Sequence, residues 1–89
     1  MELKIQLPIV HSNGTSARDL TEGYLNAATK VADAISALRQ IEFNARDYYP
    51  IAGAWDAALA EQSARVVKLH EVKNDFEQIA EHCSDFIKP

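Results

Sequence analysis

The stretch Asn44-Ala-Arg-Asp-Tyr-Tyr-Pro-Ile-Ala-Gly53 separates two long helical patterns and decides how the chain folds. Pro50 cannot continue a helix, because it has no N–H group and its ring collides with the preceding turn. A residue that precedes a proline is disfavoured in the helical region, and Gly53 lets the backbone reverse without steric cost. We therefore predict that residues 45–53 form the turn of a helical hairpin.

Apolar residues recur at helical spacing on both sides of this turn. The first set is Leu20, Tyr24, Ala27, Ala28, Val31, Ala34, Ile35, Leu38 and Ile41, and the second is Ala58, Leu59, Val66, Leu69, Val72, Phe76, Ile79 and Cys83, interrupted by Gln62. Steps of three and four place each set on one face of a helix. The pattern predicts an all-α domain over residues 1–89, with two long antiparallel helices at 16–44 and 54–86. Glu61 and Arg65 have the spacing of an ion pair on the second helix.

The beginning of the chain has a different pattern. Residues 2–7 alternate between polar and apolar side chains, which is typical of a strand. Pro8 restricts such a segment to an edge or to an extended arm. Since no second strand pattern occurs, we predict that residues 1–12 form an extended arm, which either pairs with another copy or lies along the helices.

The length of the chain favours self-association. It has 89 residues, of which 47% are hydrophobic, so it is globular in composition. A hairpin of two helices encloses no core, however, and a domain this small is marginally stable alone. We therefore predict a homo-oligomer.

Net charge and cysteine content narrow the choice of partners. The formal net charge of −4 disfavours a DNA or RNA polymer as the ligand, because such binding depends on many phosphate contacts. The single cysteine, Cys83, excludes an internal disulfide and fits a reducing compartment. The N-terminal apolar residues are too few for a signal peptide or a membrane span. We expect a cytoplasmic protein that does not bind membranes.

Metal-binding and catalytic patterns are absent from the sequence. His11, His70 and His82 lie far apart, and no H-x-x-x-H or C-x-x-C spacing occurs. Cys83 falls in the apolar pattern, where a buried small side chain is its expected role. We therefore predict no metal, no cofactor, no catalytic residue and no enzyme activity.

A small anionic ligand remains possible at the start of the first helix. Asn13, Gly14, Thr15 and Ser16 form a turn followed by two hydroxyl side chains. Helix N-termini bind phosphates, because their first N–H groups lack partners and the helix dipole is positive there. The alternative is that Thr15 or Ser16 only caps the helix, with Asp19 at the spacing of a capping box.

Three further cations and two aromatic residues are candidates for contacts with the same ligand. Lys30 on the first helix is either a surface lysine or a phosphate contact between subunits. Arg46 and Arg65 could each hold a phosphate through the fork of a guanidinium group. Alternatively, Arg46 is a solvated residue of the turn, and Arg65 pairs with Glu61. Tyr48 and Tyr49 could stack on purine bases, or could cap the apolar contact between the helices.

Several of these stretches together resemble a known family. They are His11-Ser-Asn-Gly-Thr-Ser16, Leu20-x-Glu-Gly-Tyr24, Asn44-Ala-Arg-Asp-Tyr-Tyr-Pro50 and Ala64-Arg-x-x-x-Leu69. The stretches resemble the helical-hairpin domain of phage anti-defence proteins, and the resemblance covers nearly the whole chain. These proteins sequester cyclic nucleotides and thereby counter the bacterial CBASS and Thoeris systems. The resemblance implies a hexamer in the host-cell cytoplasm that binds cyclic dinucleotides, such as cGAMP, and cyclic trinucleotides between subunits without cleaving them.

The resemblance assigns the individual residues unevenly. In the family, a Gly-Tyr-Arg stretch before the first helix supplies an aromatic ring for the cyclic dinucleotide, and a lysine on that helix meets its phosphate. Here Gly14 matches, the aromatic residue is absent, and Lys30 is the only lysine of the predicted first helix. A helical hairpin that binds another protein through its apolar surface is the alternative function.

Overall fold

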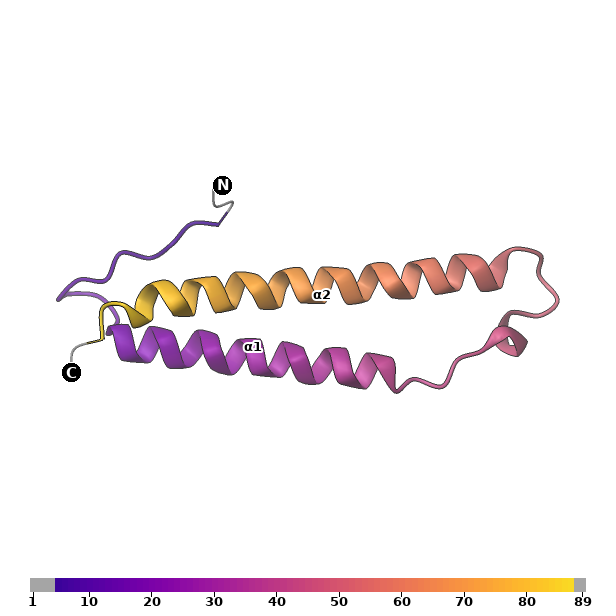
Figure 1. The fold of residues 1–89 in the computed structure, drawn as a ribbon, viewed down its shortest axis with the longest axis horizontal. Coiled ribbons are helices and arrows are strands. Elements are labelled where there is room, and N and C mark those ends of the chain that lie inside the picture. The colour runs from indigo at the N-terminus through magenta and orange to yellow at the C-terminus, as the bar shows by residue number, and fades with distance from the viewer. Residues whose placement is uncertain (1–4, 88–89) are drawn as a thin grey trace.

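The chain forms a helical hairpin in a computed structural model that describes residues 5–87 (Figure 1). Helices α1 (Ala17–Arg39) and α2 (Ala54–Ser84) run antiparallel and pack side by side, and a short 3₁₀ helix, η1 (Ala45–Tyr48), lies in their connection. No strand forms within the described range. The prediction of an all-α hairpin is confirmed.

Helix α1 begins where the sequence predicts a cap. Ser16 is extended, and its hydroxyl oxygen accepts a hydrogen bond from the backbone N–H of Asp19 at 3.0 Å. Such a bond satisfies one of the N–H groups that have no partner in the first turn of a helix. Of the two predicted caps, Ser16 is therefore the one that acts.

Helix α1 ends at Arg39, so the prediction that it continues to residue 44 is wrong. The reason lies at Asn44, which is extended and caps η1. Its side-chain oxygen accepts from the N–H of Arg46 at 3.0 Å, and its own N–H donates to the Asp47 carboxylate at 2.9 Å. These local side-chain bonds compete with a helix through residue 44, and Ile41 also lies beyond the end of α1.

The backbone reverses at Tyr49 and Gly53, as the sequence predicts. Tyr49, before Pro50, is extended, with φ −74° and ψ 137°. Gly53 has a φ of 79°, which is a left-handed conformation that favours glycine, and α2 starts directly after it. Helix α2 ends at Ser84, two residues before the predicted end.

The two helices differ in length, and the difference falls at the turn. Helix α1 has 23 residues and α2 has 31. The rings of Tyr24 and Phe76 pack with centroids 5.8 Å apart, and they lie at similar distances from the open end of the hairpin. The helices are therefore level at the open end, and about 12 Å of α2 extends past α1 at the turn.

The buried residues lie mainly along the contact between the helices. The buried apolar side chains are Ala17, Ala28, Ile35, Ala58, Ile79, Ala80 and Cys83, and Thr21 is the buried polar residue among those described. Thr21 donates its hydroxyl to the carbonyl of Ala17 at 2.7 Å. The small side chains allow close approach, which the alanine-rich sequence indicates.

Part of the predicted apolar stripe lies outside this contact. Ala34 is exposed, Ile41 is 54% exposed, and Val72 is 41% exposed. Ala17 and Ala80 are buried although they fall outside the predicted stripe. The contact face of α1 is thus rotated away from the centre of its apolar pattern.

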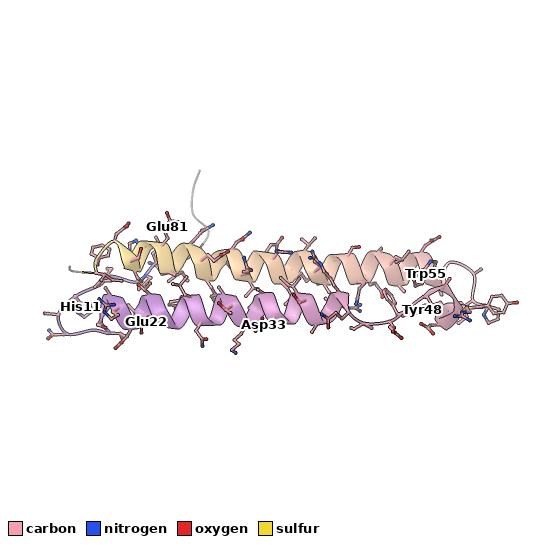
Figure 2. The ribbon with its side chains drawn as sticks, turned by 60° about the horizontal axis from the view of Figure 1, so that its bottom comes forward. His11, Glu22, Asp33, Tyr48, Trp55 and Glu81 are labelled. Atoms are coloured by element: carbon pink, nitrogen blue, oxygen red, sulfur yellow. The ribbon has the colours of Figure 1, made fainter. Side chains whose placement is uncertain are left out.

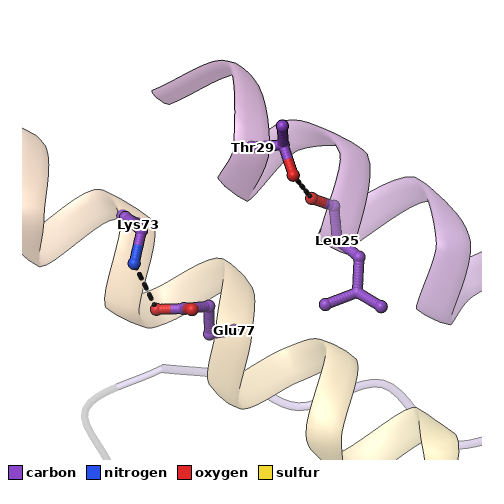
Figure 3. Close-up of polar contacts among 4 residues, drawn as sticks. All are labelled: Leu25, Thr29, Lys73 and Glu77. Carbon is purple, nitrogen blue, oxygen red and sulfur yellow. Dashed lines mark hydrogen bonds and ion pairs between the residues drawn. The ribbon is translucent and has the colours of Figure 1, made fainter. Parts of the chain in front are cut away.

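Polar contacts on the outer surface are local to each helix. Figure 3 shows that Lys73 pairs with Glu77 at 3.1 Å on α2, and that Thr29 donates to the Leu25 carbonyl at 3.0 Å on α1. The Lys73–Glu77 contact is the one ion pair among residues 5–87. The predicted pair of Glu61 with Arg65 is wrong, because the Arg65 guanidinium donates instead to the Gln62 side chain at 2.9 Å.

The segment before α1 approaches the end of α2. The Nε2 atom of His82 lies 2.9 Å from the carbonyl oxygen of Pro8. Residues 5–11 form neither helix nor strand. The first four residues of the predicted arm lie outside the described range. The segment and the C-terminal end of α2 therefore meet at the open end of the hairpin.

Candidate functional site

The predicted binding residues fall in three separate places on one chain. Asn13–Ser16 lie at the open end, Lys30 lies on the middle of α1, and Arg46, Tyr48 and Tyr49 lie at the turn, with Arg65 on the adjoining part of α2. Figure 2 shows the separation, with His11 at one end of the molecule and Tyr48 and Trp55 at the other. Since the molecule is 61 Å long, one chain cannot bring all of these residues to one small ligand.

The helix start at the open end is largely occupied by its own contacts. Ser16 caps α1, and the N–H of Gly14 donates to the carbonyl of His11 at 3.2 Å in the turn before it. A Cβ atom at Gly14 would lie 2.9 Å from Nε2 of His11. The space beside Gly14 that the sequence suggests for a ligand is thus taken by the imidazole ring of His11.

A recess adjoins this helix start. It measures about 460 Å³, and its lining comprises Val10, His11, Ser12, Ser16, Ala17, Arg18, Phe86 and Ile87. Arg18, which the sequence did not single out, is the cation in this lining. Its position in the first turn of a helix, directly after the Asn-Gly turn, is the signal that could have identified it.

Lys30 stands apart from both ends of the hairpin. It is exposed on α1 and makes no ion pair with any described residue. About 20 Å of helix separates it from Ser16. Lys30 lines neither the recess at the open end nor any recess at the turn that the described residues form with Tyr48 and Arg65.

Three aromatic side chains form a cluster at the turn. The ring centroids of Phe43 and Trp55 lie 5.3 Å apart, those of Tyr48 and Trp55 lie 5.8 Å apart, and those of Phe43 and Tyr48 lie 6.2 Å apart. Offset and edge-on pairs at these separations stabilise a fold beyond their buried area. Tyr48 thus covers the end of the helix contact, whereas Tyr49 is 82% exposed and points its ring to solvent.

A second recess brings Tyr48 and Arg65 together beside this cluster. It measures about 430 Å³, and its lining comprises Ile41, Phe43, Tyr48, Ala54, Ala57, Ala58, Glu61, Gln62 and Arg65. Ligand pockets commonly have volumes of this size, with apolar walls and a few polar groups. We call this the turn recess. It exists because α1 ends early and leaves this part of α2 without an opposite helix.

The electrostatics of the turn recess are mixed. Arg65 supplies a guanidinium group, which donates one hydrogen bond to the Gln62 side chain, while Glu61 supplies a carboxylate on the same lining. Arg46 lies outside the lining and is exposed on η1. The recess can therefore offer aromatic faces and one guanidinium group to a ligand, but a multiply charged anion needs further cations.

Three residues that line or support the turn recess are not predicted from the sequence: Phe43, Gln62 and Trp55. Phe43 and Trp55 flank the stretch 44–53, so aromatic residues on both sides of a predicted turn were the available signal. Gln62 carried a weaker signal, since it interrupts an apolar stripe.

Cys83 has no reactive environment. Its side chain is completely buried, and this burial raises the pKa of the thiol above its ordinary value. A raised pKa keeps the sulfur as a thiol, which is a poor nucleophile. Cys83 acts as a small buried side chain, as its place in the apolar pattern indicates.

Comparison of the chain with protein-family models, curated proteins and solved structures finds no match. Neither α1 nor α2, nor any other helix within residues 5–87, has the length and apolar character needed to cross a bilayer. No group of three or more metal-ligating side chains lies together in the same range.

Proposed function

We propose that this protein binds cyclic oligonucleotide second messengers and sequesters them without cleavage, in pockets formed between copies of the chain. The proposal extends the family resemblance: sequestration would deprive CBASS-type bacterial immune effectors of their activator during phage infection. The observation that carries it is the turn recess, in which Tyr48 and Arg65 lie on one lining with apolar walls. An aromatic ring can stack on a base and a guanidinium group can hold a phosphate.

Assembly of copies is part of the proposal. Cyclic dinucleotides and trinucleotides carry two or three phosphates, while each chain offers its predicted cations in separate places. In a homo-oligomer, such as the hexamer that the resemblance implies, symmetry repeats each cation around a shared pocket. A ring of three helix starts at Asn13–Ser16 would suit a trinucleotide, and the exposed Lys30 and Arg46 would be available to contacts across interfaces.

Calorimetric titration tests the proposal directly. Purified protein is titrated with 3′,3′-cGAMP and with cyclic tri-AMP, and we expect saturable heat with at least one of them. No heat with either ligand would refute the proposal. Arg65→Gln should weaken binding by about tenfold or more, since a charge-assisted bond is lost. The matched control is Arg39→Gln, because Arg39 is exposed on α1 and does not line the turn recess.

Recovery of the bound ligand separates sequestration from catalysis. After incubation, heating should release intact cyclic nucleotide, which chromatography identifies by retention time and mass. Linear products would show that the protein is a hydrolase.

The second candidate function is a module that binds another protein. An apolar groove of about 420 Å³ favours it, with a lining of Arg39, Phe43, Leu59, Gln62, Ser63, Val66 and Val67. Leu59 and Val67 are 41% and 55% exposed. A module of this kind would release no nucleotide on heating.

A further inference from the structure

The turn recess contains a negative charge that binding of an anion does not by itself explain. Glu61 lies on the lining of the recess together with Arg65. Cyclic oligonucleotides are anions, and like charges that face each other in a binding site weaken the complex. A carboxylate in such a site therefore lowers the affinity unless the ligand donates a hydrogen bond to it.

The carboxylate of Glu61 is not neutralised by its neighbour on the helix. The spacing of Glu61 and Arg65 would allow an ion pair, but the Arg65 guanidinium donates to the Gln62 side chain at 2.9 Å. The one ion pair among residues 5–87 joins Lys73 to Glu77, farther along α2. Glu61 is also exposed, so its two oxygens can accept hydrogen bonds from a ligand.

The residues of α2 that line the recess follow one another in a definite chemical order. Three alanines come first, Glu61 follows them, and Arg65 comes last. Their spacing of three and four residues puts them on one face of the helix. Glu61 lies about 6 Å along the helix axis from Ala57 on one side and from Arg65 on the other. The face thus presents an apolar surface, then a carboxylate, then a guanidinium group.

An aromatic ring lies at the alanine end of this series. The ring centroid of Tyr48 is 5.8 Å from that of Trp55, which belongs to the first turn of α2, and Tyr48 lines the recess. The small side chains of the alanines leave space beside the Tyr48 ring. A base can stack on an aromatic ring in such a position.

A ribonucleotide carries its chemical groups in the same order as this face of α2. The base is joined to the ribose, and the ribose is joined to the phosphate. With the base beside Tyr48 and the phosphate on Arg65, the sugar comes level with Glu61. An acidic side chain that accepts a hydrogen bond from the ribose 2′-hydroxyl is a common contact in dinucleotide-binding folds.

We propose that Glu61 accepts a hydrogen bond from a ribose 2′-hydroxyl, so that the turn recess selects ribonucleotides over deoxyribonucleotides. The inference rests on the proposed function, because it needs a cyclic oligonucleotide in the recess. In a 3′,3′-linked ligand the 2′-hydroxyl is the one hydrogen-bond donor of each sugar, since the other sugar oxygens lie in the ring or in phosphodiesters. A deoxyribose ligand would leave the carboxylate beside an anion without a compensating bond.

The order of groups along α2 favours the sugar over a base as the partner of Glu61. Guanine could also donate to a carboxylate, through N1–H and its N2 amino group, whereas the same edge of adenine has one donor and one acceptor. A contact of that kind would make the affinity depend on the base. Glu61 lies between the stacking surface and Arg65, however, where the sugar of a bound nucleotide belongs, so its contact should serve both bases equally.

A thermodynamic cycle tests the contact. 3′,3′-cGAMP and cyclic tri-AMP are titrated calorimetrically against wild type and Glu61→Ala, each alongside its 2′-deoxy analogue. Wild type should bind the ribose form roughly tenfold or more tightly than the deoxy form, because a charge-assisted bond is lost. In Glu61→Ala this ratio should fall to about one, since the acceptor is missing. Removal of the charge should change the affinity for both forms alike, so the ratio isolates the hydrogen bond.

The matched control is Glu71→Ala. Glu71 is exposed on α2 and does not line the turn recess, so this variant removes the same charge and should keep the wild-type ratio. Equal binding of the ribose and deoxy forms by wild type would overturn the inference, and so would a ratio that Glu61→Ala leaves unchanged.

Two further outcomes separate this inference from its alternatives. Cyclic di-GMP and cyclic di-AMP differ only in their bases, and a preference for cyclic di-GMP that disappears in Glu61→Ala would show that Glu61 contacts guanine instead of the sugar. The absence of heat with every cyclic nucleotide would refute the proposed function, and this inference with it. Saturable heat with a ribose-to-deoxy ratio that does not respond to Glu61 would refute this inference alone.

Discussion

The open half and the turn half of the hairpin hold their helices together in different ways. In the open half, α1 and α2 pack directly on each other, and Ala28, Ile35 and Cys83 are buried between them. In the turn half, α2 extends past the end of α1, and the aromatic cluster of Phe43, Tyr48 and Trp55 takes the place of a helix. The difference explains why a recess that holds both Tyr48 and Arg65 lies at the turn, where one helix has lost its partner, although a second recess adjoins the start of α1 at the open end.

The same difference explains the distribution of candidate binding residues. The loop from 40 to 53 covers α2 incompletely and leaves the turn recess beside it, with Tyr48 and Arg65 on its lining. Changes that affect the two halves separately can therefore test the comparison.

The largest effect is expected where α1 and α2 pack directly on each other. Ile35→Ala removes a side chain that is 4% exposed, and the lost contacts and the resulting cavity should lower the free energy of unfolding by about 2–4 kcal/mol. Ile51→Ala is the matched control, because Ile51 in the turn is 72% exposed and should change stability by less than about 0.5 kcal/mol. Urea unfolding followed by circular dichroism measures both, and equal losses would show that the packing described is wrong.

The next effect should be confined to the turn half. Trp55→Ala removes the ring that contacts both Phe43 and Tyr48, which should destabilise this half by about 2 kcal/mol. Amide hydrogen exchange should become faster in residues 41–58 and stay unchanged in the part of α1 that packs on the end of α2. Faster exchange along the whole of both helices would mean that the two halves unfold as one unit.

A smaller effect is expected at the start of α1. Ser16→Ala removes the hydroxyl that caps the helix and should cost about 1 kcal/mol in the free energy of unfolding. Thr15→Ala is the control, since the Thr15 side chain makes no hydrogen bond with a described residue. If the two variants lose the same stability, Ser16 is not the cap.

The smallest effect concerns Cys83. The raised pKa of its thiol makes the free energy of unfolding depend on pH only above neutral pH. Burial raises the pKa of the thiol in the folded chain, so the folded state keeps its proton at a pH where the unfolded state has lost it. The resulting stability is complete below the ordinary pKa of 9.0 and falls as the pH rises above it. The difference in unfolding free energy between wild type and Cys83→Ala should therefore shrink from pH 8 to pH 10, and a constant difference would contradict the buried thiol.

The fold could be predicted from the sequence wherever a local rule decides the structure. Helical spacing predicts the two helices of the hairpin, Ser16 predicts the start of α1, and Gly53 predicts the reversal before α2. The end of α1 is not predictable from the apolar spacing, because that spacing continues to Ile41, whereas the helix ends at Arg39 and Asn44 caps η1 instead. A periodic pattern shows which residues are apolar, but it does not show where a competing cap interrupts the backbone.

The candidate site was less predictable for the same reason. Tyr48 and Arg65 share a recess only because α1 ends at Arg39, so their proximity could not be derived from spacing within either helix. The sequence does not distinguish the two tyrosines, but Tyr48 packs in the aromatic cluster and Tyr49 is exposed. Which of two neighbouring rings turns inward depends on Trp55 and Phe43, which come from other segments.

The central claim is that the proposed binding pockets form between copies of the same chain. Native mass spectrometry of the wild-type protein at low micromolar concentration tests it most directly. The account predicts an assembly of two or more 9.9 kDa chains. A folded species with the mass of a single chain at that concentration would contradict it.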